Sequence, residues 1–241
     1  QLVIQENTGT FFSAKIFPID ELKKRKETEF ATNEKQILSM LNHPNIIKYY
    51  DSFSIHNNID EKEYFVIITE YCENGSLTNY ISQNDTDECF IKETFYKISR
   101  AIEYLHDQGI SHGDIKLDNI LLDENLNPKL CDFGFAKKVE ISKNSKKYCT
   151  VIYAPPELLM HGSYDPKIAD IWSLGISLYA TKYKKWPFPP GASIRNQILR
   201  GKIELDLNDD TQKLIHSCIQ KDPKKRATIK DVLKSEYFAF C

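Results

Sequence analysis

Short apolar runs alternate with polar ones over the first 17 residues, QLVIQENTGTFFSAKIF. The runs at 2–4 and 11–17 flank ENTGT, whose Asn, Gly and Thr residues favour a turn. Two apolar runs around such a turn are typical of a β-hairpin. We therefore expect two antiparallel strands, with Lys15 near the end of the second.

Residues 20–41 are charged early and apolar late, which predicts one helix from Asp20 to Leu41. Two apolar runs follow, HPNIIKYYDSF at 43–53 and EYFVIITEYC at 63–72. Each predicts a strand, and the polar stretch SIHNNIDEK between them predicts a loop. The N-terminal part of the chain is therefore expected to be rich in strands.

The pattern changes to a helical period after ENGSL at 73–77. Five apolar residues recur at steps of 4, 3, 4 and 3, and they are Ile91, Phe95, Ile98, Ile102 and Leu105. This spacing places them on one face of a helix. Gly109 marks the expected end of that helix, because glycine adopts the left-handed conformation that often follows a last turn.

Beyond this helix, the runs NILLD at 119–123 and PKLCDFG at 128–134 predict short strands. Most of the remainder is helical in pattern, including the apolar stretch at 168–183. These patterns predict an α+β fold of two lobes, residues 1–72 and 73–241, that together form one domain. The connection between the lobes is expected near residues 70–76.

The composition limits the class of protein. The 241 residues include 32 basic and 34 acidic ones, which argues against a nucleic-acid partner bound through a general basic field. No apolar run approaches the roughly 20 residues that span a bilayer, so no membrane partner is expected. The six cysteines form no C-x-x-C pair, which favours reduced thiols and a cytoplasmic protein, with the nucleus as an alternative.

Four polar residues form the candidate chemistry. Asp114 and Asn119 lie five positions apart, and Asp132 follows in CDFG. Carboxylate and amide oxygens on neighbouring loops suit Mg²⁺, which binds few protein ligands together with substrate phosphates. Lys116 adds a positive charge near the place where a transferred phosphoryl group develops negative charge.

These residues belong to longer motifs that occur in order along the chain. The motifs are FSAKI at 12–16, NEKQIL at 33–38, HGDIKLDNILLD at 112–123, DFG at 132–134, PPE at 155–157, DIWSLG at 170–175 and DPKKRAT at 222–228. With them the chain resembles the eukaryotic protein kinase family of the serine/threonine type, over nearly its whole length. The resemblance implies a bilobal kinase fold, with a small antiparallel-sheet N-lobe truncated at its start and a larger helical C-lobe.

The resemblance also implies a role for each matching residue, with ATP and Mg²⁺ as cofactors. Lys15 pairs with Glu34 and grips the α- and β-phosphates. Asp114 orients the substrate hydroxyl and accepts its proton, while Lys116 neutralises the γ-phosphate. Lys15 and Glu34 could instead form a solvated surface ion pair. Their placement in a strand and a helix of the expected order outweighs that alternative.

Further residues are expected to hold the metal or the architecture. Asn119 and Asp132 bind Mg²⁺ in this interpretation. Asp170 anchors the backbone of the catalytic loop, and Arg226 pairs with Glu157 to brace the substrate-binding loop. The stack that links the lobes in the active state is expected to contain Leu38, Tyr49, His112 and Phe133, so His112 is not proposed as a base.

The stretch IITEYCENGSL resembles the hinge that receives adenine. Thr69 stands at the gatekeeper position, and backbone groups of Glu70 and Cys72 are expected to bind the adenine edge. Ser76 and Leu121 complete the expected ATP-binding set. Cys131 directly precedes Asp132, and the sequence leaves open whether the pKa of its thiol is low enough for reactivity.

Gly113 stands where most family members have an arginine that binds a phosphate on the activation loop. We therefore expect activity to depend little on phosphorylation of that loop through this arginine route. Thr150 is expected to contact Asp114 and, with Lys116, to favour a serine or threonine substrate. The five lysines between 137 and 147 predict a solvated flexible loop, with an acidic docking preference as the alternative.

One part of the family pattern is missing. A glycine-rich G-x-G-x-x-G loop is expected roughly 15 to 20 residues before Lys15, and the chain starts too late to contain it. The chain is thus expected to be a fragment of a longer protein or to be degenerate there. The second case keeps open a pseudokinase scaffold that binds partners or nucleotide without turnover, although all six catalytic and ATP-clamping residues are present.

Two further alternatives concern the group within the family. HGD also occurs in phosphotransferases that act on aminoglycosides or choline, but Lys116, CTVIYAPPE and the motifs around Asp170 and Arg226 resemble protein kinases instead. EYCENGSL resembles the calmodulin-dependent and the NIMA-related kinases without deciding between them. A protein substrate and a monomeric catalytic domain are the expected partner and assembly.

Overall fold

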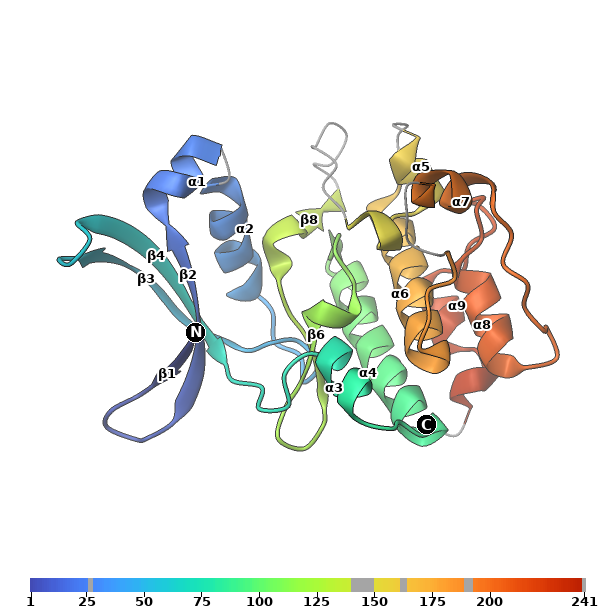
Figure 1. Ribbon diagram of the computed structural model, residues 1–241, viewed down its shortest axis with the longest axis horizontal. Helices are drawn as coiled ribbons and strands as arrows, with labels where there is room; N and C mark the ends of the chain where they lie inside the picture. Colours follow the sequence, from blue (N-terminus) through green and yellow to red (C-terminus); the bar gives the residue numbers. More distant parts are fainter. Residues whose placement is uncertain (26–27, 140–149, 161–163, 189–192, 240–241) are drawn as a thin grey trace.

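A four-stranded antiparallel sheet forms the N-terminal part of the computed structural model, which describes all residues except 26–27, 140–149, 161–163, 189–192 and 240–241 (Figure 1). The strands are β1 (Leu2–Ile4), β2 (Phe11–Pro18), β3 (Tyr49–Asn57) and β4 (Lys62–Glu70), in the order β1-β2-β4-β3. The predicted hairpin is confirmed, because β1 pairs with β2 in the register Leu2 opposite Ser13.

The helix predicted over 20–41 is wrong as a single element. Two helices are present, α1 (Ile19–Arg25) and α2 (Thr28–Leu38). The charged half and the apolar half of the pattern belong to different helices. After Leu38 the chain tightens, since Leu41 N donates to Leu38 O at 3.2 Å in an i to i−3 turn.

The strand predicted over 43–53 also needs correction. Strand β3 begins only at Tyr49 and continues to Asn57, so most of the predicted polar loop is strand. Ile46 and Ile47 are buried, but outside the sheet: Ile46 bridges Leu130. Backbone pairing with β4 carries β3 past the end of the apolar run, because a hairpin ladder can extend through exposed polar residues.

The C-terminal part is mainly helical, as predicted. Helix α4 (Glu88–Asp107) contains the five-residue apolar face, and each of those residues is at most 3% exposed. The helix starts three residues before Ile91, the first residue of that face, because Asp87 caps it by accepting a hydrogen bond from Phe90 N at 2.8 Å. Gly109 follows the helix with a φ of 73°, which confirms the predicted end.

The other helices in the C-terminal part are α3 (Leu77–Gln83), α5 (Pro156–Leu159), α6 (Pro166–Tyr183), α7 (Ile194–Arg200), α8 (Asp210–Cys218) and α9 (Ile229–Leu233), with short 3₁₀ turns η4 (Val151–Tyr153) and η5 (Glu236–Phe238). Of these helices, α6 and α9 pack against α4. Trp172 of α6 is fully buried at the centre of this packing. Within the ranges given above, no helix is both long and apolar enough to cross a membrane.

Two small sheets lie between the four-stranded sheet and the helices. One pairs β5 (Ile110–Ser111) with β8 (Lys137–Lys138), and the other pairs β6 (Ile120–Leu122) with β7 (Pro128–Leu130). The turns η1 (Leu117–Asn119) and η2 (Phe133–Phe135) follow β5 and β7. These short strands place the two motif-bearing loops side by side.

Part of the expected lysine-rich loop is therefore strand. Lys137 and Lys138 form β8, because their backbones pair with Ser111 and Ile110. Lys143, Lys146 and Lys147 lie outside the described residues. Figure 1 shows the sheet with α1 and α2 on one side of the motif-bearing loops and the helical part on the other, consistent with the predicted two-lobe architecture. The exact boundary at residue 72 remains a prediction.

Candidate active site

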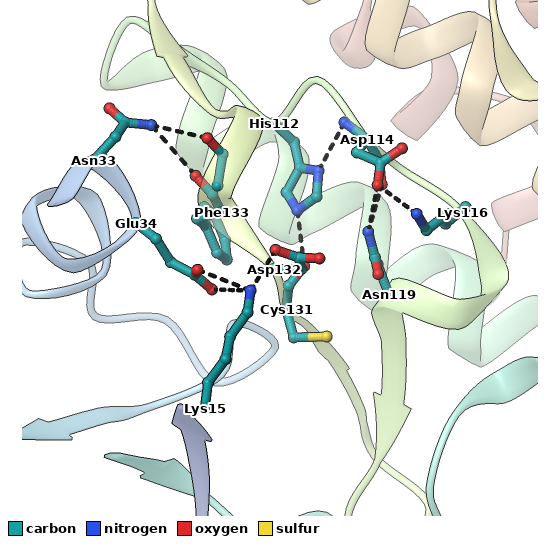
Figure 2. Close-up of polar contacts among 11 residues, drawn as sticks. Lys15, Asn33, Glu34, His112, Asp114, Lys116, Asn119, Cys131, Asp132 and Phe133 are labelled. Carbon is teal, nitrogen blue, oxygen red and sulfur yellow. Dashed lines mark hydrogen bonds and ion pairs between the residues drawn. The ribbon is translucent and has the colours of Figure 1, made fainter. Parts of the chain in front are cut away.

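Lys15 joins three elements at the centre of the site (Figure 2). Its Nζ, on β2, donates to Glu34 of α2, with 2.9 Å to Oε1 and 2.8 Å to Oε2. The same Nζ lies 2.7 Å from Oδ1 of Asp132, in the loop between β7 and η2. The predicted pair is present, and it extends to a second carboxylate.

Burial and charge act in opposite directions on these three groups. Burial alone would lower the pKa of Lys15, but the carboxylates of Glu34 and Asp132 hold it above its usual value. Burial likewise opposes ionisation of Asp132, yet the Lys15 ammonium keeps the pKa of Asp132 below its usual value. The pKa of buried Glu34 is raised, since burial outweighs the attraction of Lys15. Lys15 is thus a cation and Asp132 an anion near neutral pH.

Asp132 has an unusual backbone. Its φ of 63° and ψ of 75° lie in the left-handed region, which non-glycine residues seldom adopt. The preceding residue is tied to the catalytic loop, since Cys131 N donates to Asn119 O at 2.9 Å. The turn ends β7 at Leu130, which explains why PKLCDFG is strand only in its first three residues.

Asp114 is the centre of a second polar cluster, and only 5% of it is exposed. Its Oδ2 accepts hydrogen bonds from Lys116 Nζ at 2.5 Å and from Asn119 Nδ2 at 3.1 Å. Its Oδ1 accepts one from Thr150 Oγ1 at 3.0 Å. Asn119 Nδ2 also bonds Asp114 O at 2.8 Å, so the loop closes on itself. The contact expected between Thr150 and Asp114 is present.

Asp170 of α6 holds the backbone that precedes Asp114. Its Oδ2 accepts from His112 N at 2.9 Å, and its Oδ1 accepts from Gly113 N, also at 2.9 Å. His106 of α4 donates to Asp170 Oδ2 through Nε2 at 3.0 Å. The expected anchor is thus in place, with His106 as an additional partner.

Gly113 has a left-handed backbone and lies close to the backbone of the loop that carries Asp132. Its φ is 82°, and a Cβ built there would lie 2.8 Å from the carbonyl oxygen of Phe135. A cavity of about 30 Å³ lies against this loop, lined among others by Ser111, Gly113, Tyr164 and Asp170. Any side chain at this position would have to displace the backbone of the loop that carries Asp132.

His112 is enclosed by backbone groups. Its Nδ1 accepts from Asp114 N at 3.2 Å, and its Nε2 donates to Cys131 O at 3.0 Å, which assigns the tautomer. The ring contacts Phe133 edge-on, with 4.8 Å between centroids. Both nitrogens are used, so His112 has a structural position, as the sequence indicated. Leu38 and Tyr49, the other expected members of the stack, pack into the same core.

Arg226 and Glu157 form a buried bidentate pair. The two bonds measure 2.6 Å from Nη1 to Oε1 and 3.0 Å from Nη2 to Oε2. The Arg226 side chain is 0% exposed. Its guanidinium also lies 5.1 Å from the Trp172 ring centroid, which adds a cation–π contact.

The expected hinge residues begin inside the end of β4, which contains Thr69 and Glu70. Glu70 directs its side chain to Lys48 N at 2.7 Å and to Lys129 Nζ at 3.0 Å. Ser76 caps α3 by accepting from Asn79 N at 3.3 Å, and it bridges Leu121 of β6. Ser76 and Leu121 are thus neighbours on the C-terminal side of the hinge. Thr69 pairs with Ser13 and with Tyr49 in the sheet.

The two cysteines near the site are poor nucleophiles. Burial raises the pKa of Cys72 to about 12. Burial, reinforced by the charge of Asp132, raises the pKa of Cys131 well above that of an ordinary thiol. Both thiols are therefore protonated near neutral pH, and the open question about Cys131 reactivity is answered against it.

Asn119 and Asp132 offer hard oxygen donors on adjoining loops, which suits Mg²⁺. Among the described residues no group of three His, Cys, Asp or Glu side chains could hold a metal by itself. Mg²⁺ needs few protein ligands, because phosphate oxygens and water complete its shell. The residues present therefore fit the implied metal.

The sequence predicts no role for Asn33 or His106. Asn33 precedes Glu34, but an amide beside a helical glutamate carries no spacing signal of its own. His106 belongs to the apolar end of α4, where the pattern indicates only burial. In both cases the partner lies on a distant segment, which the structure alone reveals.

Comparison with known proteins identifies the family to which the motifs and the site geometry point. The family profile described as "Protein kinase domain" matches residues 1–238. The chain is 36% identical over 253 residues to 3-phosphoinositide-dependent protein kinase B of Dictyostelium discoideum, covering 99% of this chain and 27% of that protein. It is 34% identical over 231 residues to NUAK family SNF1-like kinase 1 of Homo sapiens, covering 93% and 34%.

A third relative is serine/threonine-protein kinase SIK2 of Gallus gallus, 33% identical over 210 residues, which cover 85% of this chain and 26% of that protein. The chain thus spans about a quarter to a third of the length of these curated relatives.

Proposed function

Because the chain belongs to the protein kinase family, we propose that it transfers the γ-phosphoryl group of Mg·ATP to a serine or threonine hydroxyl of a protein substrate. The names of its relatives, serine/threonine-protein kinase among them, support this class of reaction. The names do not separate the calmodulin-dependent from the NIMA-related group, so the subgroup stays a prediction.

The observation that carries the proposal is the convergence of two polar clusters on adjoining loops (Figure 2). One is the cation–anion group of Lys15, Glu34 and Asp132, and the other surrounds Asp114. Cys131 N and Asn119 O join the two loops directly at 2.9 Å. Phosphoryl transfer needs such positioning and charge more than covalent chemistry from the protein.

When bound, ATP would supply the phosphoryl group and Mg²⁺ would neutralise negative charge on the phosphate oxygens. Protonated Lys15, aligned by Glu34, would bind the α- and β-phosphates. Ionised Asp132 and the amide oxygen of Asn119 would bind the metal. The hinge backbone at Glu70 and Cys72, with Thr69, Ser76 and Leu121 around it, would receive the adenosine.

Asp114 would accept the proton of the substrate hydroxyl. The hydroxyl oxygen would form the new bond to phosphorus as the bond to ADP breaks and ADP leaves. Thr150 and Lys116 hold the carboxylate in one orientation through its two oxygens. The Lys116 ammonium would also neutralise negative charge on the γ-phosphoryl group during its transfer. The Thr150–Lys116–Asp114 arrangement supports serine or threonine over tyrosine as the acceptor.

Turnover of Mg·ATP by the full-length protein on a serine/threonine peptide array tests the proposal. Asp114→Asn removes the proton acceptor and keeps the shape, so we expect a loss of about 100-fold or more in kcat. Asp85→Asn, a carboxylate-to-amide change at an exposed position, should retain activity.

Equal turnover by the wild type and Asp114→Asn would contradict the proposal. Binding of Mg·ATP without turnover in the wild type would instead favour the pseudokinase alternative.

A further inference from the structure

Helix α2 directs two neighbouring side chains toward the loop at residues 132–136, which we call the magnesium loop. Glu34 reaches Lys15, as described above. Asn33 points to backbone carbonyl groups of the loop itself (Figure 2). Its Nδ2 donates to Ala136 O at 2.8 Å and lies 3.4 Å from both Phe133 O and Gly134 O.

One side-chain amide thus binds three carbonyl groups of a single turn. An amide nitrogen has two hydrogens, so the bond to Ala136 is the strong one and the other two share the second hydrogen. Ala136 N also donates to Phe133 O at 3.1 Å, which closes the turn that Asn33 covers. Asn33 therefore holds the magnesium loop in its present shape.

The shape of this loop decides where Asp132 points. Asp132 has a left-handed backbone, a strained conformation that persists only when its surroundings hold it. Lys15 restrains the carboxylate from the nucleotide side, and Asn33 restrains the following residues from the helix side. A ring contact between Phe30 and Phe135, 5.2 Å between centroids, adds packing between the same two elements.

We propose that Asn33 is a positioning residue that couples the placement of helix α2 to the orientation of the magnesium-binding carboxylate of Asp132. The two residues Asn33 and Glu34 move together on one helix. Displacement of α2 would therefore release the loop and the Lys15 ion pair at once. The part of this proposal that concerns Mg²⁺ rests on the proposed function, whereas the restraint on the loop does not.

Three variants of the full-length protein test the role. Asn33→Ala removes the donor, and alanine is the better helix former, so weakening of α2 cannot explain a loss. Asn33→Asp keeps the shape but presents acceptors to three carbonyl oxygens. Gln36→Ala, at an exposed position of the same helix, is the matched control.

The first measurement uses no nucleotide. Hydrogen exchange of peptides that cover residues 132–136 should be about fivefold faster in Asn33→Ala than in the wild type, the factor expected for one lost hydrogen bond. Asn33→Asp should exchange at least as fast, and Gln36→Ala at the wild-type rate. Wild-type exchange in Asn33→Ala would overturn the proposal.

The second measurement is the Mg²⁺ concentration needed for half-maximal binding of a non-hydrolysable ATP analogue. We expect it to rise about fivefold in Asn33→Ala and further in Asn33→Asp. A general loss of stability would lower the melting temperature without changing this Mg²⁺ requirement.

An unchanged requirement in both Asn33 variants would overturn the link to Asp132. If the wild type binds the analogue but never transfers phosphate, the proposed function is wrong. The hydrogen-exchange and Mg²⁺ measurements still test the role of Asn33 in that case, because neither depends on turnover.

Discussion

Gly113 is the residue whose meaning changes most between sequence and structure. As a sequence feature it is the absence of an arginine. In the structure it is a left-handed residue whose missing Cβ permits contact with Phe135 O. The catalytic loop and the magnesium loop therefore approach each other closely at Gly113, because no side chain separates their backbones. Most family members are expected to have an arginine at this position.

Replacement of Gly113 by alanine should be costly. The left-handed backbone costs a residue with a Cβ about 1–2 kcal/mol, and the contact with Phe135 O adds about 1–3 kcal/mol. Gly109→Ala is the matched control, because Gly109 has a φ of 73° but no atom within 4 Å of the built Cβ. Chemical denaturation of both variants measures the difference.

We expect Gly113→Ala to lose more stability than Gly109→Ala. Equal losses would show that the approach to Phe135 is not a restraint. Gly113→Arg should behave like the alanine variant and gain no response to phosphorylation, since the backbone has no room for it.

At the scale of elements, the activation segment reaches the site through Thr150. It lies just before η4, and its hydroxyl is the link between that segment and Asp114. Lys116 Nζ also donates a hydrogen bond to Thr150 Oγ1, at 3.3 Å. The segment is thus tied to the catalytic loop by a side chain of its own.

Alanine variants along the segment should therefore differ. Thr150→Ala should lose most of the activity, whereas Thr150→Ser should keep most of it because the hydroxyl remains. Variants at Ser142, Ser145 and Tyr148, which lie outside the described residues, should stay close to the wild type. Turnover of the full-length protein on one peptide substrate provides the comparison.

A complete loss in Ser145→Ala, restored by Ser145→Glu, would contradict this view. It would mean that a phosphate on the segment still controls the site by a route that does not involve position 113.

Elements were predictable where their pattern was local. The apolar face of α4 has a regular period, so its existence followed from five residues. The start of β3 could not be predicted in this way, because Ile46 and Ile47 form an apolar run whose burial comes from packing outside the sheet. Sequence period cannot distinguish these two origins of burial.

At the scale of the whole molecule, long-range ion pairs connect the loops to the helical part. Arg226, between α8 and α9, binds Glu157 at the start of α5. Asp170 of α6 reaches the catalytic loop differently, by accepting hydrogen bonds from the backbone N–H groups of His112 and Gly113. The helices thus act as a frame that holds segments far apart in the chain.

Loss of the Arg226–Glu157 pair should destabilise the frame. Arg226→Ala leaves a buried carboxylate without its partner, which costs about 3–5 kcal/mol. Lys225→Ala, at the exposed neighbouring position, should change stability by about 0.5 kcal/mol or less. Chemical denaturation gives both values, and a similar small change in the two variants would contradict the structural role of the pair.

The sequence by itself determined the family resemblance, the α+β class and the identity of the residues around Asp114 and Asp132. These follow from residue types and their spacing along the chain. Only the tertiary structure decided the division of the first helix, the left-handed backbone at Gly113 and Asp132, and the contacts of Asn33 and His106. The physical reason is that these features depend on atoms from distant segments, such as Phe135 O and Ala136 O, whose approach no local pattern encodes.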